Sequence, residues 1–315
     1  MAYRKRLIWL GVLALLCMVG YMTLNLQGAL GYVIPRRFTK LAAMLVTSVA
    51  IGVSTLIFQT VTMNRILTPN VIGLDSLYML LQTGLLFLFG SSILLEVGIE
   101  VRFVATILLM VGFAIVLYQL LFRGEGRNVY FLLLVGLVFG TFFGSITSFL
   151  QLLMDPNEFQ LLQDRSFASI NNVDSDLLML TTVLLVLNTA WLWRYVRFLD
   201  VLALGRDHAI NLGIPYEKIV KRLLIIVAIY ISIATALIGP ITFLGLLIVN
   251  VAYQLIPTYR HHALAVATVL LGVIALVGGQ LIVEHVLNFS TTLSVILNLI
   301  GGSYFIYLLL KGVDR

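Results

Sequence analysis

Residues 129–154 read VYFLLLVGLVFGTFFGSITSFLQLLM, a run of apolar and small side chains without a single charged residue. A helix needs about twenty such residues to cross the hydrocarbon core of a membrane. The whole chain has this character, because 61% of its 315 residues are hydrophobic and only 11% are charged. Since the apolar runs are continuous rather than alternating, they predict spanning helices and not a β-barrel. The predicted fold class is therefore an all-α, polytopic membrane protein.

The same length criterion predicts ten spans, which together form one membrane domain over residues 1–315. Their approximate ranges are 7–24, 40–58, 71–90, 101–122, 129–154, 177–199, 217–237, 240–257, 263–283 and 292–310. The first run resembles a signal peptide, but it is long enough to span and no small-residue cleavage pattern follows it. We therefore expect it to be the first span.

The basic residues separate into two groups when the ten spans are laid across a membrane. With both termini inside, fifteen of the 20 Lys and Arg residues fall on the inner side; the outer five are Arg36, Arg37, Lys40, Arg102 and Arg165. This bias follows the positive-inside rule and predicts a multi-pass membrane protein with cytoplasmic termini. Because the basic residues are scattered through short loops, they do not indicate nucleic-acid binding.

Two loops between the predicted spans are long enough to carry structure of their own. The outer loop, about 155–176, is acidic and can hold a short helix. The inner loop, about 200–217, contains LALGRDHAINLG at 202–213, which predicts a short amphipathic helix closed by glycines. A plain surface connector is the alternative interpretation of that inner loop.

Small residues recur every four positions along the fifth predicted span, at Gly136, Gly140, Gly144 and Ser148. Residues four apart share a helix face, so the pattern lets another backbone approach closely. Close packing alone is the simpler interpretation. The alternative is that the stripe, with Ser145 beside it, lines a conduit for a polar cargo.

Catalytic patterns are missing from the sequence. It has no glycine-rich phosphate loop ending in Gly-Lys-Ser or Gly-Lys-Thr, so ATP cannot bind in the usual cradle. The four histidines (His208, His261, His262 and His285) are too dispersed for a metal site and are expected in solvated loops. Asp75 is the one carboxylate inside a predicted span, and we expect it to brace helix ends. A membrane-embedded enzyme is therefore a poor hypothesis.

Five motifs follow one another along the chain. They are Pro35-Arg36 before the second span; Gln59 with Asn64 to Pro69 and Gly73; Leu204-Gly205, Ala209 and Leu212-Gly213; Phe243-Leu244-Gly245-Leu246; and Gly301-Gly302 before an aromatic run. In this order they resemble the permease subunits of ABC importers of the FecCD or vitamin B12 permease type. The pattern is most similar to the iron–siderophore branch.

The resemblance implies a type II ABC importer permease that moves an iron–siderophore complex across the bacterial cell (inner) membrane. Haem or cobalamin is the alternative cargo, and a proton-coupled secondary transporter is the alternative machine. The implied partners are two copies of an ABC ATPase, a substrate-binding protein and a second permease, for which a different chain is favoured over a second copy. No cofactor would bind this chain directly, because ATP-Mg would sit on the ATPase. In the family, spans two to five and seven to ten form inverted halves.

The resemblance also assigns roles to residues. Contact with the ATPase would involve Leu204, Gly205, Arg206, Asp207, Ala209, Leu212 and Gly213. Docking of the binding protein would involve Pro35, Arg36 and Arg37. The translocation pathway would involve Gln59, Gly136, Gly140, Gly144, Ser145, Ser148 and Asn298.

Overall fold

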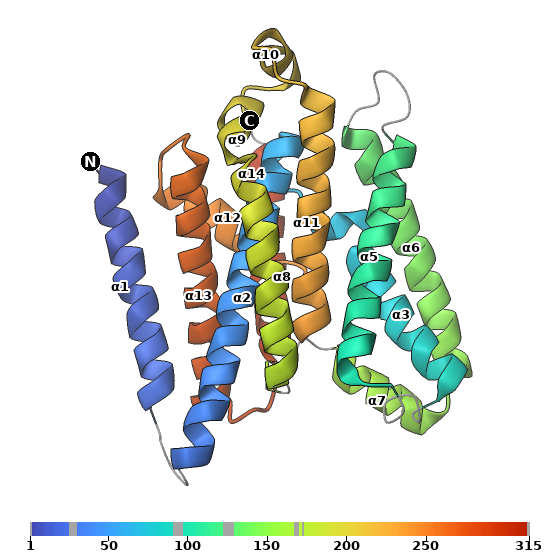
Figure 1. Cartoon of the computed structure of the whole chain (residues 1–315). Helices are drawn as coiled ribbons and strands as arrows, with labels where there is room; N and C mark the ends of the chain where they lie inside the picture. Colours follow the sequence, from blue (N-terminus) through green and yellow to red (C-terminus); the bar gives the residue numbers. More distant parts are fainter. Residues whose placement is uncertain are drawn as a thin grey trace.

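The computed structural model describes residues 2–24, 30–90, 97–121, 129–166, 170–171 and 173–313, and within these ranges all regular structure is helical (Figure 1). The elements are α1 (Ala2–Thr23), α2 (Leu30–Thr62), the 3₁₀ turn η1 (Pro69–Ile72), α3 (Leu74–Phe89), α5 (Ile99–Leu121), α6 (Val129–Leu153), α7 (Pro156–Ser166), α8 (Ser175–Trp193), α9 (Val196–Leu202), α10 (Arg206–Asn211), α11 (Tyr216–Ile238), α12 (Leu244–Leu255), α13 (His261–His285) and α14 (Leu293–Val313). The all-α prediction is confirmed.

Each of the ten predicted spans corresponds to one helix of the bundle. Eight of these helices are long and apolar enough to cross a membrane, whereas α3 and α12 are shorter apolar helices. At about 1.5 Å per residue, the 12 residues of α12 extend only about 18 Å, well short of the roughly 30 Å hydrocarbon core. The 16 residues of α3 extend about 24 Å, so neither helix alone matches the length of a full crossing.

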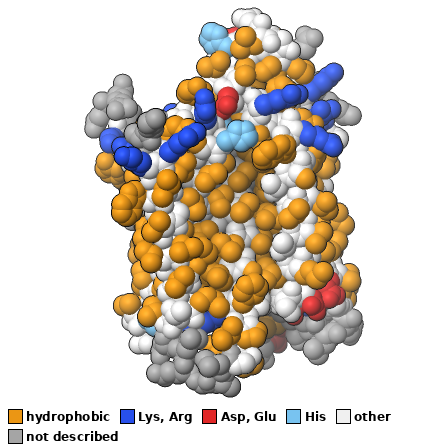
Figure 2. Space-filling view, turned by 60° about the vertical axis from the view of Figure 1, so that its left-hand side comes forward, with side chains coloured by type: hydrophobic (Ala, Val, Ile, Leu, Met, Phe, Trp, Pro, Cys, Tyr) orange, Lys and Arg blue, Asp and Glu red, His pale blue; other side chains and the backbone are white. Residues whose placement is uncertain are grey.

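The molecule has two ends of different charge. The short helix α10 projects from one end, here called the α10 end. The N-terminal end of α1 and the C-terminal end of α14 lie toward the same end (Figure 1). Most Lys and Arg side chains in view gather at this end, with single acidic side chains among them, and a further acidic group lies at the opposite end (Figure 2). The helix α7, within the acidic loop, lies at that opposite end (Figure 1).

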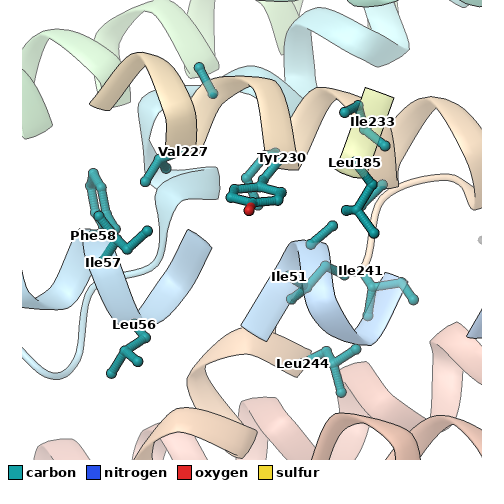
Figure 3. Close-up of a cluster of buried hydrophobic side chains, with 14 of the residues drawn as sticks. Ile51, Leu56, Ile57, Phe58, Leu185, Val227, Tyr230, Ile233, Ile241 and Leu244 are labelled. Carbon is teal, nitrogen blue, oxygen red and sulfur yellow. The ribbon is translucent and has the colours of Figure 1, made fainter. Parts of the chain in front are cut away.

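Helices α2 and α11 form the centre of the bundle. Of the membrane-length segments, that of α2 is 83% buried and that of α11 is 72% buried, against 11% for α1. Between them lies a core of branched side chains around Tyr230, with Ile51 and Ile57 from α2 and Val227 and Ile233 from α11 (Figure 3). The Tyr230 hydroxyl shares a 2.8 Å hydrogen bond with Thr189 of α8, which satisfies the polar tip of a buried ring.

Two halves of the bundle repeat one set of neighbours. In the first half, α2, α3, α5 and α6 follow in order; in the second, α11, α12, α13 and α14 do so. α2 packs on α13 and α12, and correspondingly α11 packs on α5 and α3. Within each half the second helix contacts the fourth, as α3 with α6 and α12 with α14. Because α2 and α11 run in opposite directions (Figure 1), the halves are inverted.

Candidate translocation and coupling sites

The first half contains a helix break, defined here as residues 63–73 between α2 and α3. Met63 ends α2 with a left-handed φ of 52°, and Gly73 admits α3 with φ 88°. Between them Pro69 opens the 3₁₀ turn η1, where its missing N–H does no harm. A left-handed φ is costly for Met but not for Gly, so the entry to this first break is its more strained side.

The second half contains the corresponding break, defined as residues 239–243 between α11 and α12. Gly239 caps α11 with φ 95°, and its N–H donates to the Thr235 carbonyl. Pro240 follows, which cannot continue the helix and biases the residue before it away from helical geometry. This second break is therefore a short, sharp interruption, whereas the first break is long.

A glycine of the fourth helix in each half packs directly on the break. A Cβ atom placed on Gly136 of α6 would lie 2.7 Å from Ile72 Cα, and one on Gly301 of α14 would lie 2.5 Å from Phe243 Cβ. Both distances are shorter than two non-bonded carbon atoms can approach, so each site requires glycine. One turn further along α6, Gly140 packs on Gly73, where an added Cβ would lie 3.3 Å from its Cα. The close-packing interpretation therefore holds for Gly136 and Gly140.

Polar side chains connect each break to the opposite half. The amide of Asn250, on α12, donates to the Arg65 carbonyl in the first break at 2.9 Å, and buried Gln59 donates to the same oxygen at 2.7 Å. In the reverse direction, the Asp75 carboxylate on α3 accepts from Thr242 in the second break at 3.4 Å and from Thr235 at 3.5 Å. The expected bracing role of Asp75 is thus observed, through long and hence weak hydrogen bonds.

The remaining part of the α6 stripe faces outward. A Cβ on Gly144 would meet nothing within 4 Å, and Ser145 and Ser148 are exposed on the surface of the chain. The Ser145 hydroxyl donates to the Thr141 carbonyl within the helix, so it presents acceptor lone pairs outward. On α14, Asn298 is only half-buried, and its side-chain oxygen is enclosed without a hydrogen-bond partner among the described residues. Ser145 and Ser148 thus lie on a surface that the single chain leaves uncovered, whereas the polar oxygen of Asn298 is enclosed.

The inner loop forms the predicted short helix, α10. Gly205 precedes it with φ 99° and Gly213 follows it with φ 80°, conformations that favour glycine. Ala209 is fully buried and anchors α10 on the rest of the protein. Apolar side chains next to it remain exposed, with Leu204 at 57% and Leu212 at 63%. The polar residues Arg206 and Asp207 are exposed too, so α10 offers a mixed, protruding surface.

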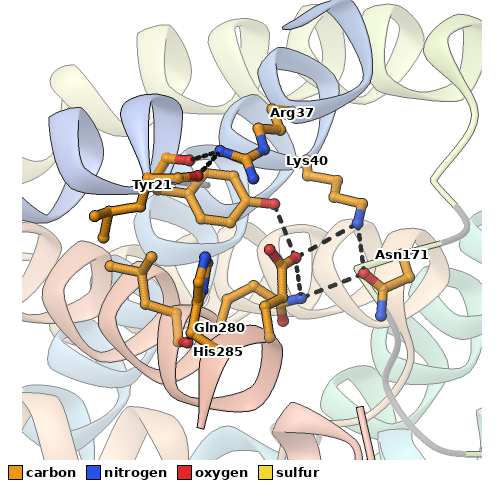
Figure 4. A network of polar contacts seen from close by, with 9 residues as sticks. Tyr21, Arg37, Lys40, Asn171, Gln280 and His285 are labelled. Atoms are coloured by element: carbon orange, nitrogen blue, oxygen red, sulfur yellow. Dashed lines mark hydrogen bonds and ion pairs between the residues drawn. The ribbon is translucent and has the colours of Figure 1, made fainter. Parts of the chain in front are cut away.

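The outer basic residues differ in their surroundings. Arg37 donates to the carbonyl oxygens of Tyr21 and Leu24 at 2.8 and 2.7 Å, so it caps the end of α1. Lys40 lies 3.6 Å from Glu284 and donates to Asn171 at 2.7 Å (Figure 4). Arg36 is exposed, as is Pro35, and its guanidinium donates to the Tyr32 hydroxyl at 3.0 Å.

An open cavity of about 470 Å³ connects these groups at the end opposite α10. Its lining consists of Tyr21, Tyr32, Val33, Arg36, Arg37, Lys40, Asn171, Glu284 and Phe289. A single carboxylate, Glu284, faces three cations there, so the cavity carries positive charge. It is suited to receive an acidic group.

The prediction that all four histidines lie in solvated loops is wrong for His261. This residue begins α13 and is only 4% exposed. Its ring lies between Asp200 of α9 and Thr60 of α2. No local signal indicates this burial, because neighbouring His262 is exposed and the two histidines cannot be distinguished by composition.

Residues 7–311 match the sequence model of the FecCD transport family. The chain belongs to this family. It is accordingly a transporter permease subunit of ABC importers and not an enzyme, and ATP is hydrolysed by a separate subunit. A multi-pass protein of the bacterial membrane follows as well.

Relatives with known assignments cover most of the chain. It is 54% identical over 299 residues to the petrobactin import system permease protein YclO of Bacillus subtilis, which covers 95% of both chains. It is 33% identical to the petrobactin import system permease protein FatC of Bacillus anthracis, covering 89% of this chain and 79% of the other. A solved structure described as an inward-facing metal-chelate type ABC transporter superposes with a TM-score of 0.85 at 20% identity, over 98% and 99% of the two chains. This last likeness supports the fold alone.

Proposed function

We propose that this chain is the permease subunit of an importer for an iron–siderophore complex of the petrobactin type. The 54% identity to a petrobactin import permease over nearly the whole chain carries this proposal. The inverted halves with their two helix breaks provide an architecture for alternating access. In this arrangement α10 and both termini face the cytoplasm, in agreement with the basic side chains at that end.

Reconstitution tests the energy source. Proteoliposomes that hold this chain with its second permease, ATPase and binding protein should accumulate iron-labelled petrobactin only when ATP is present on the α10 side. Omission of the ATPase should abolish uptake. Accumulation driven by a proton gradient without any ATPase would contradict the proposal and favour a secondary transporter.

The exposed residues around α10 form the proposed contact with the ATPase. Leu204, Ile210 and Leu212 supply exposed apolar area, and Arg206 and Asp207 flank it with charge. The substitutions Gly205→Leu and Gly213→Leu place a branched side chain on left-handed backbone, which distorts the ends of α10. Uptake should fall while the protein remains inserted. Normal uptake in both variants would contradict the assignment.

The second permease would cover the outward part of the α6 stripe. Gly144, Ser145 and Ser148 then line a pathway between two permease subunits, whereas Gly136 and Gly140 serve packing within this one. Asn298 on α14 and buried Gln59 on α2 complete the proposed pathway residues, and Gln59 donates to the Arg65 carbonyl of the first break. Co-purification of differently tagged copies distinguishes a homodimer from the heterodimer that the family resemblance favours.

The binding protein would dock at the outer cavity, and Arg36 is the residue best placed to meet it. Arg37 is held by carbonyl oxygens at the end of α1 and Lys40 lies against Glu284, whereas Arg36 is exposed beside Tyr32. The substitution Arg36→Glu should weaken docking about tenfold at low salt and reduce its salt dependence, because exposed charges at an interface mainly steer encounter. Arg36→Lys is the matched control, since it keeps the charge. Equal binding of both variants across salt concentrations in a surface-binding assay would exclude this role.

A further inference from the structure

His261 joins three helices at the α10 end by hydrogen bonds from one buried ring. Its Nδ1 lies 2.6 Å from the Asp200 carboxylate of α9, and because a carboxylate accepts, Nδ1 donates. Its Nε2 lies 2.9 Å from the Thr60 hydroxyl near the end of α2. Its side chain is 5% exposed, against 35% for Asp200. Water therefore cannot replace these partners easily.

Asp200 makes a second contact that fixes its position. The same carboxylate oxygen accepts from the backbone N–H of His261 at 2.9 Å. Since Arg260 provides no side-chain cap for α13, Asp200 caps that helix from another element. A carboxylate at a helix N-terminus also interacts favourably with the helix dipole. Asp200 and His261 are thus held together by both backbone and side chain.

The link continues from Thr60 toward the first break. The Tyr253 side chain of α12 hydrogen-bonds with Thr60, and the Arg65 guanidinium lies 4.6 Å from the Tyr253 ring. At its other end the link is close to α10, because Asp200 lies on α9 only a few residues before Gly205. A continuous series of polar contacts therefore joins the segment preceding α10 to the break that packs on Gly136.

We propose that His261 is a positioning residue that transmits movement of the α9–α10 segment to α2, α13 and the first break. This inference rests on the proposed function, in which α10 contacts the ATPase. Displacement of α9 would pull Asp200, and the two short hydrogen bonds of His261 would carry that displacement into α13 and α2, and from α2 to the first break. Without the ring, α10 could still follow the ATPase, but the break would respond less.

The test compares uptake with ATP hydrolysis in the complete importer in proteoliposomes, with iron-labelled petrobactin as probe. The substitution His261→Ala should leave ATP hydrolysis within about twofold of wild type and lower uptake per ATP about tenfold, the factor expected for loss of a buried hydrogen-bonded partner. His262→Ala is the matched control, because that neighbouring side chain is exposed. It should leave the ratio unchanged.

Variants of the two partners separate transmission from a general loss of packing. Asp200→Asn keeps an acceptor for both His261 donors and should retain near-normal uptake per ATP, whereas Asp200→Ala should reproduce the His261→Ala defect. The double variant Asp200→Ala with His261→Ala should be no worse than either single one. If His261→Ala lowers the folded yield, Thr60→Val tests the link from the other side with nearly the same shape.

The inference would be overturned by an unchanged ratio in His261→Ala or Thr60→Val, or by defects that multiply in the double variant. Failure of the proposed function has a different signature. It would appear in the wild-type importer, as absence of ATP-dependent uptake, before any variant is compared.

Discussion

The two helix breaks occupy equivalent places in the two halves of the bundle, but their segments differ in length. The first break uses residues 63–73, with a 3₁₀ turn and Arg65, whereas the second uses only residues 239–243 around Gly239-Pro240. Despite this difference, a glycine from the fourth helix of each half closes on each break, Gly136 on one and Gly301 on the other. The equivalence of the halves therefore lies in packing geometry and not in matching sequence.

The difference in length has a consequence for what each break can contact. In the longer first break, the backbone carbonyl of Arg65 accepts hydrogen bonds from two side-chain amides. The second break offers the hydroxyl of Thr242 instead, which reaches a carboxylate on α3. The first break is thus held by shorter and stronger hydrogen bonds than the second, and it is also the break closest to α10. It is the better candidate for the element that moves with the ATPase.

The largest expected effect comes from adding one methyl group at Gly136 or at Gly301, the two glycines that pack on the breaks. Gly136→Ala and Gly301→Ala both force atoms apart that already touch, which costs about 1–3 kcal/mol each by overpacking. We expect the midpoint of thermal unfolding in detergent to fall by several degrees in both variants, with a parallel loss of uptake. Gly112→Ala on α5 is the control, because its added carbon meets nothing within 4 Å and the residue lies outside the proposed pathway.

Similar losses in the two variants would support the equivalence of the breaks. A loss confined to Gly136→Ala would contradict it, and would assign rigid closure to the first half only. Unchanged stability in both would mean that the fourth helices do not pack on the breaks.

A smaller effect is expected when the tie between α12 and the first break is cut. Asn250→Leu removes the donor to the Arg65 carbonyl while Gln59 still satisfies that oxygen, so the loss should be about 1 kcal/mol. Gln254→Leu is the matched control on the same helix, because its amide is exposed and, among the described residues, donates only to the Tyr304 hydroxyl. Thermal unfolding of both variants checks the difference. Equal shifts would show that the buried tie contributes no more than the exposed one.

The sequence predicted the order and number of apolar helices because membrane thickness imposes a length that can be counted. It also predicted α10, since glycines at 205 and 213 mark helix ends by a local conformational preference. It placed the span at 71–90 as an ordinary crossing and the span at 240–257 as the shortest one, beginning at the break Gly239-Pro240. In the structure both α3 and α12 are short and follow breaks. The length and hydropathy of an apolar run cannot distinguish a short helix that follows a break from a helix of full membrane length.

Pairings between distant residues could not be predicted from composition. The partners of His261 lie 61 and 201 residues away in sequence, and nothing local distinguishes His261 from His262. Likewise, the pair Arg36-Arg37 was expected to act as one docking site, but only the structure separates an exposed Arg36 from an Arg37 that caps α1. Such differences depend on which helices pack together, and local sequence patterns do not predict those contacts.

The smallest expected effect concerns Asp75, the tie to the second break. Its hydrogen bonds with Thr235 and Thr242 are 3.5 and 3.4 Å long, so loss of the charge with retention of shape should matter little. Asp75→Asn should change stability by at most about 1 kcal/mol and leave ATP-driven uptake within about twofold. Asp75→Leu removes the acceptors altogether and should lower stability more. Abolition of uptake by Asp75→Asn alone would instead indicate that a proton or cation moves with the cargo, because a secondary transporter depends on ionisable groups at membrane depth. The same carboxylate thus separates a brace between the two halves from a coupling site.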